Sequence, residues 1–152
     1  MKILHVTAGL DKSGAGVRET VLELSRAQGH QGACVQVIGF DSPNLTQDAA
    51  DWHGISVKPV SVVGPALFGY APTMTQEIAA ADPDIVHLHG LWTHHGRSTL
   101  QWAQKSGCPY VLSPHGMLAP AALSYSRYRK RLVSIWFQER VLASASALHA
   151  TS

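Results

Sequence analysis

Short apolar runs alternate along the chain with longer segments in which apolar residues recur every three or four positions. The short runs predict strands at Lys2–Ala8, Gly32–Phe40, Ile55–Val63, Asp84–His89, Pro109–Pro114 and Ala147–Thr151. The longer segments predict helices at Val17–Ala27, within Asp41–Trp52, and at Thr73–Ala81, Thr93–Lys105 and Ala121–Ala143. This alternation, with right-handed crossovers, predicts an α/β fold: a Rossmann-like, doubly wound parallel sheet with helices on both faces. Pro59 cannot donate a ladder hydrogen bond, so we place the third strand at a sheet edge.

The last predicted helix carries an apolar stripe and a basic face. Its stripe consists of Tyr125, Tyr128, Leu132, Ile135, Trp136 and Leu142, and its opposite face carries Arg127, Lys130 and Arg131. Two interpretations stay open. Either the stripe packs on the core beneath a solvated basic face, or the cations attract an anionic membrane or a phosphate-bearing acceptor.

Composition narrows the class of protein. The chain has 152 residues, 45% hydrophobic and 14% charged, which is typical of one folded domain spanning 1–152 and excludes disorder. A formal net charge of +2 gives no reason to expect nucleic-acid binding. Cys34 and Cys108 match no redox or zinc spacing and are interpreted as buried, reduced thiols. No window approaches the roughly 20 apolar residues of a membrane span, so we expect a cytoplasmic protein whose membrane contact, if any, is peripheral.

Ligands of doubly wound sheets bind at the carboxyl ends of the strands, which directs attention to three loops. The first, Gly9–Gly16, leads into a helix whose N-terminal amides suit a phosphate. It lacks the Gly-Lys-Ser/Thr of a P-loop, and the best GxGxxG alignment places Glu19 where a third glycine belongs. A nicotinamide-dependent enzyme, with Asp41 on a ribose, therefore remains only an alternative, as does a loop whose glycines merely make the turn.

The other two loops are rich in histidine. His87, His89, His94, His95 and His115 fall near strand ends, and alternation places the first two on one face. A zinc-dependent hydrolase is an alternative, but no Asp or Glu lies between residues 84 and 139, so we expect no metal. We interpret His87 as a packed, hydrogen-bonded strand residue. His115, followed by Gly116 at a strand end, is expected to contact a ligand.

Four motifs together resemble a known family. The segments MKILHVTAGLDKSGAG, PDIVHLHGLW, SPHGMLAPAAL and ALHATS look like the N-terminal half of a family 4 glycosyltransferase of the GT-B fold. The resemblance covers essentially the whole chain, and HGML-x-P is typical of a branch associated with bacterial surface-polysaccharide assembly. It implies two Rossmann-like domains facing across a cleft, the first binding the acceptor and the second an activated sugar. It also implies transfer with retention of configuration, without a bound metal or other cofactor.

The resemblance further implies roles for particular residues. Gly14, Ala15 and Gly16 correspond to the loop that approaches the donor diphosphate and the acceptor, with Ala15 departing from the glycine pair of many relatives. His115 and Gly116 match the His-Gly beside the donor sugar, where the histidine would position the sugar or stabilise charge.

Acceptor contacts are expected for three further residues, two from the resemblance and one from its position. His89 and Gly90 match a second pair facing the cleft and are expected to contact the acceptor, and Arg18 is expected to reach it as well.

The donor-binding half has no counterpart in this sequence. The family's glutamate pair belongs to the C-terminal domain, so we expect this chain alone to be inactive. The expected partners are a nucleotide-sugar donor, held together with that domain, and a glycan or lipid-linked acceptor. A stand-alone glycan-binding module, or one subunit of a two-polypeptide transferase, remains the alternative.

Overall fold

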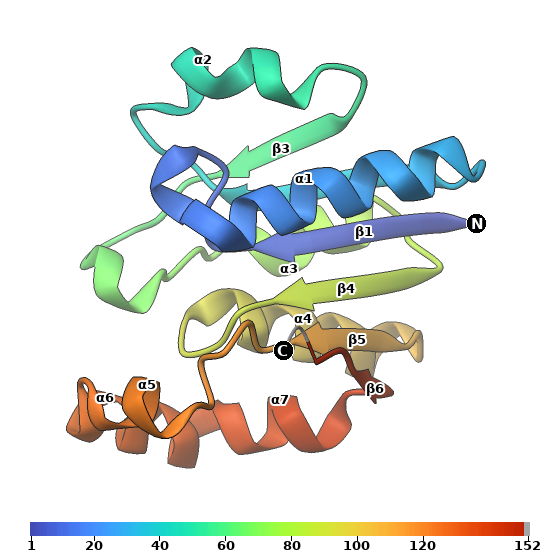
Figure 1. Ribbon diagram of the computed structural model, residues 1–152. Helices are drawn as coiled ribbons and strands as arrows, with labels where there is room; N and C mark the ends of the chain where they lie inside the picture. Colours follow the sequence, from blue (N-terminus) through green and yellow to red (C-terminus); the bar gives the residue numbers. More distant parts are fainter. Residues whose placement is uncertain (151–152) are drawn as a thin grey trace.

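One sheet of six parallel strands organises the part of the chain that the structure describes (Figure 1). The structure is a computed structural model, and it describes residues 1–150 apart from the side chains of Leu123, Arg127 and Arg129. The strand order is β3-β2-β1-β4-β5-β6, which confirms the Rossmann-like, doubly wound prediction. The strands are β1 (Lys2–Thr7), β2 (Cys34–Phe40), β3 (Ser56–Val60), β4 (Ile85–His89), β5 (Tyr110–Ser113) and β6 (Ala147–Leu148).

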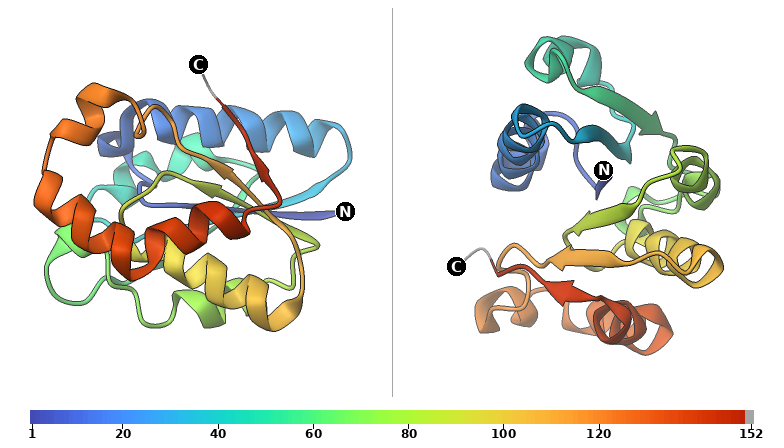
Figure 2. Two further views of the ribbon diagram at one scale, coloured as in Figure 1. Left: turned by 90° about the horizontal axis from the view of Figure 1, so that it is seen from below. Right: turned by 90° about the vertical axis from the view of Figure 1, so that its right-hand side faces the viewer.

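Helices cover both faces of this sheet (Figure 2). The α-helices are α1 (Ala15–His30), α2 (Leu45–Asp48), α3 (Met74–Ala80), α4 (His94–Ser106), α5 (Pro120–Ser124), α6 (Arg127–Val133) and α7 (Glu139–Ser144). Tighter or wider turns are η1 (Lys12–Gly14), η2 (Ala49–Trp52), η3 (Ala66–Phe68) and the π-helical η4 (Ser134–Gln138). Helix α1 lies on one face, whereas α3 and α4 lie on the other (Figure 2). The core divides accordingly into a small cluster under α1 and a larger one under α3 and α4.

Strand register decides which polar residues meet. In the parallel ladder of β1 and β4, His5 pairs with His87, and in the ladder of β4 and β5, His89 pairs with Ser113. The side chains of these residues are buried. Strand β3, which contains Pro59, lies at the edge of the sheet, as predicted.

The single helix predicted at Ala121–Ala143 is broken. Ser126 adopts a left-handed conformation, with φ of 56°, between α5 and α6, and the π-helical η4 follows. The predicted core-facing stripe is wrong, because Tyr128 is 88% exposed and Leu132 is 71% exposed. The buried residues of this segment are instead Val133, Phe137, Gln138 and Val141. The apolar stripe therefore faces outward, except for Leu142, which packs against the core.

Two smaller expectations can be compared with the structure. Both cysteines are free, but Cys34 is exposed and Cys108 is partly exposed, so the prediction of buried thiols is wrong. Within residues 1–150, no helix is long and apolar enough to cross a membrane. The last predicted strand is confirmed as β6, although its end at Thr151 lies outside the described residues.

Candidate active site

The carboxyl ends of β1, β4 and β5 lie side by side, so the three loops singled out from the sequence meet at one edge of the sheet (Figure 1). The backbone N–H of Gly90 donates to the carbonyl of Ser113 at 2.9 Å and ties two of the loops together. Gly90 has a φ of 84°, and a Cβ there would lie 3.2 Å from the Met117 side chain. His115 has a φ of 50°, a strained conformation for a residue other than glycine. Strain of this kind at a strand end is typical of a functional loop.

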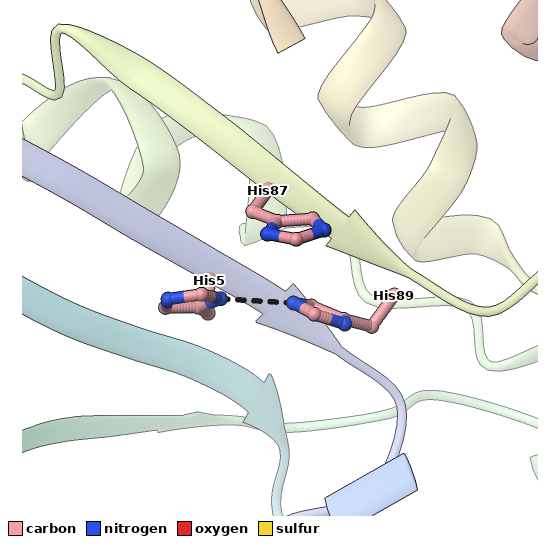
Figure 3. A group of neighbouring side chains, drawn as sticks. All are labelled: His5, His87 and His89. Carbon is pink, nitrogen blue, oxygen red and sulfur yellow. Dashed lines mark hydrogen bonds between the residues drawn. The ribbon is translucent and has the colours of Figure 1, made fainter. Parts of the chain in front are cut away.

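A row of three histidines runs from the buried core to this edge. His5 Nε2 lies 2.7 Å from Gln28 Oε1, and His5 Nδ1 lies 2.8 Å from His89 Nε2 (Figure 3). The far nitrogen of His89, Nδ1, lies 2.9 Å from His115 Nε2. We call His5, His89 and His115 the histidine row.

The amide of Gln28 sets the direction of these hydrogen bonds. Its carbonyl oxygen accepts, so His5 donates from Nε2 and its Nδ1 becomes an acceptor. His89 then donates from Nε2 to His5, and His115 donates from Nε2 to His89. In neutral imidazoles this order leaves the Nδ1 of His115 with a lone pair, able to accept a hydrogen bond from a sugar hydroxyl.

Burial keeps the cluster uncharged. Desolvation lowers the pKa of His5 and takes the pKa of His89 well below its ordinary value, with repulsion from neighbouring imidazoles adding to the second shift. Partial burial, reinforced by nearby His149, also lowers the pKa of His115. At neutral pH the row is therefore a chain of neutral hydrogen-bonding groups.

His87 lies beside the row without joining it. Its ring stacks on that of His89 at 4.1 Å, and its Nε2 lies 2.7 Å from Ser113 Oγ. The stacking confirms that both residues share one face, and the buried hydrogen bond confirms the prediction of a packed strand residue. Ligand atoms of His5, His87 and His89 lie within 4.8 Å of one another (Figure 3). A metal there would displace hydrogen bonds that already use both nitrogens of His5 and of His89.

The glycine loop folds back on itself before α1. A Cβ on Gly9 would lie 2.9 Å from the Cα of Gly14, so the two backbone segments approach as closely as only glycine allows. Ala15 has a φ of 45°, in a region that favours glycine. This backbone conformation explains why many relatives have glycine here, and it strains the alanine of this chain. Ala15 and Gly16 are exposed at the N-terminus of α1, the end of a helix that attracts an anion. The N–H groups of Gly14 and Ala15 already donate to the carbonyls of Asp11 and Lys12.

Arg18 is buried beneath this loop. Its side chain is 1% exposed, and its guanidinium pairs with Asp51 at 2.7 Å and with Glu19 at 2.5 Å. It also donates from Nε to the carbonyl of Leu10 and lies over the ring of Trp52. The structure thus places Arg18 as a support of the loop, and contact with an acceptor would require it to leave these partners.

The predicted basic face is only partly solvated. Arg131 is exposed, whereas Lys130 is half-buried, donates to the carbonyl of Ala122 and lies 5.7 Å from the centre of the Trp92 ring. The side chain of Arg127 is not among those that the structure describes. This segment is separate from the histidine row in sequence and follows the loop that carries His115.

Sequence reasoning missed two members of the site, His5 and Gln28. Neither lies near a predicted loop, because His5 is in the middle of β1 and Gln28 is near the end of α1. Only the pairing of β1 with β4 brings His5 to His89.

The fold is a Rossmann-like α/β domain, and the histidine row reaches the carboxyl edge of its sheet. Residues 15–152 match the sequence profile of the glycosyl transferase 4-like domain, and the chain belongs to this family.

Two curated relatives match along most of the chain. Over 153 aligned residues the chain is 29% identical to the GDP-mannose:cellobiosyl-diphosphopolyprenol alpha-mannosyltransferases of Xanthomonas campestris and Xanthomonas oryzae pv. oryzae. The match covers 97% of this chain but 38% of each relative, so the chain spans about two fifths of their length.

Similar folds occur in Anabaena Alr3699/HepE, solved with UDP and glucose, at a TM-score of 0.68 and 16% identity over 97% of this chain and 37% of that one. They occur also in Staphylococcus aureus MnaA, solved with UDP, at a TM-score of 0.60 and 15% identity over 98% of this chain and 37% of that one.

Proposed function

We propose that this chain is the acceptor-side half of a retaining, metal-independent glycosyltransferase that moves a sugar from a nucleotide-sugar to a glycan or lipid-linked acceptor. A donor-binding domain would supply the second wall of the cleft. The observation that carries the proposal is the histidine row, which ends in a half-buried imidazole at the sheet edge where three loops meet. The name of the Xanthomonas relatives, which gives a diphosphopolyprenol-linked cellobiose as the acceptor, supports a role in polysaccharide biosynthesis.

The chemistry assigned to His115 is positioning rather than attack. Its Nδ1 lone pair accepts a hydrogen bond from a hydroxyl of the donor sugar, while His89 and His5 hold the ring in one tautomer. The loop of Gly14, Ala15 and Gly16 approaches the diphosphate as the glycosidic bond breaks, and the positive end of the α1 dipole favours that anion. His89 is 1% exposed, so its part is to orient His115. Gly90 is buried as well, so contact of this pair with the acceptor requires the loop to open.

The cleft needs both walls before the transition state is stabilised, so we propose that this chain alone is inactive. We also propose that the working enzyme is cytoplasmic and touches the inner face of the membrane peripherally, through the basic segment that includes Arg127, Lys130 and Arg131. Arg131, which is exposed there, is worth about 1 kcal/mol of attraction to an anionic leaflet.

The test compares His115→Ala with His53→Ala in protein that includes the donor-binding domain. His53 is exposed and lies far along the chain from the three loops, so it controls for the loss of an imidazole. We expect His115→Ala to lower kcat about 100-fold, the effect of removing one aligned polar group at the transition state, without lowering the unfolding midpoint comparably. The product's anomeric configuration, read by NMR, reports retention. Normal turnover by His115→Ala would remove this residue from the mechanism.

A further inference from the structure

An apolar pocket opens beside the histidine site at the carboxyl ends of β3 and β4. Its volume is about 480 Å³, within the range of small-molecule sites. Three segments line it: the loop after β3, the turn into α4, and the α6–η4 segment. Apart from the imidazole of His94, the lining side chains are aliphatic or aromatic, with Phe68, Tyr70, Trp92, Val133, Trp136 and Phe137 contributing most of the large groups.

Two cations lie against aromatic rings of this pocket, although neither lines it. The Arg97 guanidinium lies 4.8 Å from the centre of the Trp136 ring, and the Lys130 ammonium lies 5.7 Å from that of Trp92. Both rings line the pocket. The chain is also polarised in charge. Residues 85–152 carry seven Lys and Arg against one carboxylate, Glu139 (net +6), whereas residues 1–84 carry five against nine (net −4). An anionic group is therefore favoured at this end of the molecule.

The surface around the pocket is apolar as well. Tyr128, Leu132 and Ile135 are 88%, 71% and 70% exposed on the α6–η4 segment. Trp136, on the pocket wall, is 54% exposed. Clustered exposed side chains of this size mark a binding surface. An apolar pocket with an apolar rim and flanking cations matches a ligand that joins a long hydrocarbon chain to a strongly anionic head.

Position along the chain connects this pocket to the site. Trp92 follows Gly90 in the loop after β4, and His94 is the first residue of α4, where its ring lies edge-on against that of Tyr70 at 4.8 Å. The next residue, His95, has its Nε2 2.8 Å from the carbonyl of His89. A molecule seated in the pocket would thus present its head group toward the loop that holds the histidine row.

We propose that this pocket binds the first isoprene units of a polyprenyl diphosphate-linked acceptor, with Arg97 and Lys130 facing the diphosphate. The inference rests on the proposed function, which supplies the lipid-linked acceptor, and it adds where the lipid lies. Concave shape and ligand-sized volume favour one inserted chain over a flat protein partner. The charge favours a diphosphate over a neutral lipid.

Binding of farnesyl diphosphate to protein that includes the donor-binding domain tests the pocket directly. Phe68→Ser, in the loop after β3, and Trp136→Ser, in η4, each remove an aromatic wall. We expect each to raise the Kd at least about tenfold, the effect of losing one buried aromatic contact. The matched control is Ile135→Ser, which removes an exposed apolar side chain outside the pocket and should leave the Kd unchanged. Arg97→Gln should weaken farnesyl diphosphate while leaving the affinity for farnesol unchanged.

The outcomes separate the pocket from bilayer adsorption and from the proposed function. The proposal would be overturned if Phe68→Ser and the original protein bound farnesyl diphosphate with equal Kd values. It would also be overturned if only Ile135→Ser weakened binding. Transfer assays then use a water-soluble acceptor without a lipid chain. If Phe68→Ser lowers transfer to the lipid-linked acceptor but not to the soluble one, the pocket is supported. If no protein, including the original, transferred sugar to either acceptor, the result would count against the proposed function. The Kd for farnesyl diphosphate would still show whether the pocket binds the lipid.

Discussion

Lowering the pH from 7 to 5 is expected to remove a large part of this protein's free energy of unfolding. Burial lowers the pKa of His87 to about 3 and that of His95 to about 4. In the unfolded chain both imidazoles have a pKa near 6.5, so the unfolded state binds more protons throughout this range. Stability is therefore full above pH 6.5 and falls as the pH drops from there toward 3 to 4.

The magnitude follows from the size of these pKa shifts. At pH 5 each of the two histidines lies about 1.5 pH units below its unfolded pKa, which costs about 2 kcal/mol per residue. Together they remove about 4 kcal/mol, and His5 and His89, whose pKa values are lowered by burial as well, add to this loss. Since domains are stable by about 5–15 kcal/mol, the fold should be close to unfolding near pH 5.

Urea unfolding followed by far-UV circular dichroism at pH 7.5, 6.5, 5.5 and 5.0 measures this loss. His95→Gln keeps a donor near the His89 carbonyl, which His95 Nε2 contacts at 2.8 Å, but cannot titrate. It should reduce the slope of unfolding free energy against pH below 6 by about 1.4 kcal/mol per pH unit, or one proton. His53→Gln, at an exposed position, is the control and should keep the original slope. A free energy of unfolding that changed by under about 1 kcal/mol between pH 7 and 5 would refute the assignment of buried neutral histidines.

Other substitutions test the packing that supports the site. Tyr110→Phe removes the buried hydroxyl that donates to the Val141 carbonyl at 2.5 Å, and it should lower the unfolding free energy by about 1–2 kcal/mol in urea titrations. Gly39→Ala would place a Cβ 2.6 Å from Cγ of buried Leu10, so a loss of about 1–3 kcal/mol is expected on the same assay. Gly29→Ala, in α1 with nothing within 4 Å, should instead add about 0.5–1 kcal/mol. A destabilised Gly29→Ala, or a neutral Gly39→Ala, would contradict the packing described.

Local sequence determined the elements and the edge of the sheet at which the candidate site lies. Strand and helix periods depend only on neighbouring residues, so β1, β4 and β5 could be predicted. Helix α4 ends at Gly107, whose φ of 74° favours glycine. The motifs around His89 and His115 identified the family as well. Pro59 placed β3 at the edge because its missing N–H is a local property.

Helical spacing alone misjudged the segment after residue 120. A period shows which residues share a face, but not which face turns inward. Val133, Phe137 and Val141, spaced by four, form a second apolar series, and this series is the buried one. The left-handed Ser126 and the wide turn of η4 change the direction of the chain and rotate its faces. As a result, Tyr128, Leu132 and Ile135 face outward.

Only the tertiary structure decided which distant polar groups meet. His5 and His89 are 84 residues apart in sequence, and Gln28 belongs to a helix on one face of the sheet. Their contact depends on β1 lying between β2 and β4, an order that no local pattern encodes. The same holds for the apolar pocket, whose walls come from three separate segments. Local spacing therefore determined the elements and the loops, whereas long-range packing determined the histidine row and the pocket beside it.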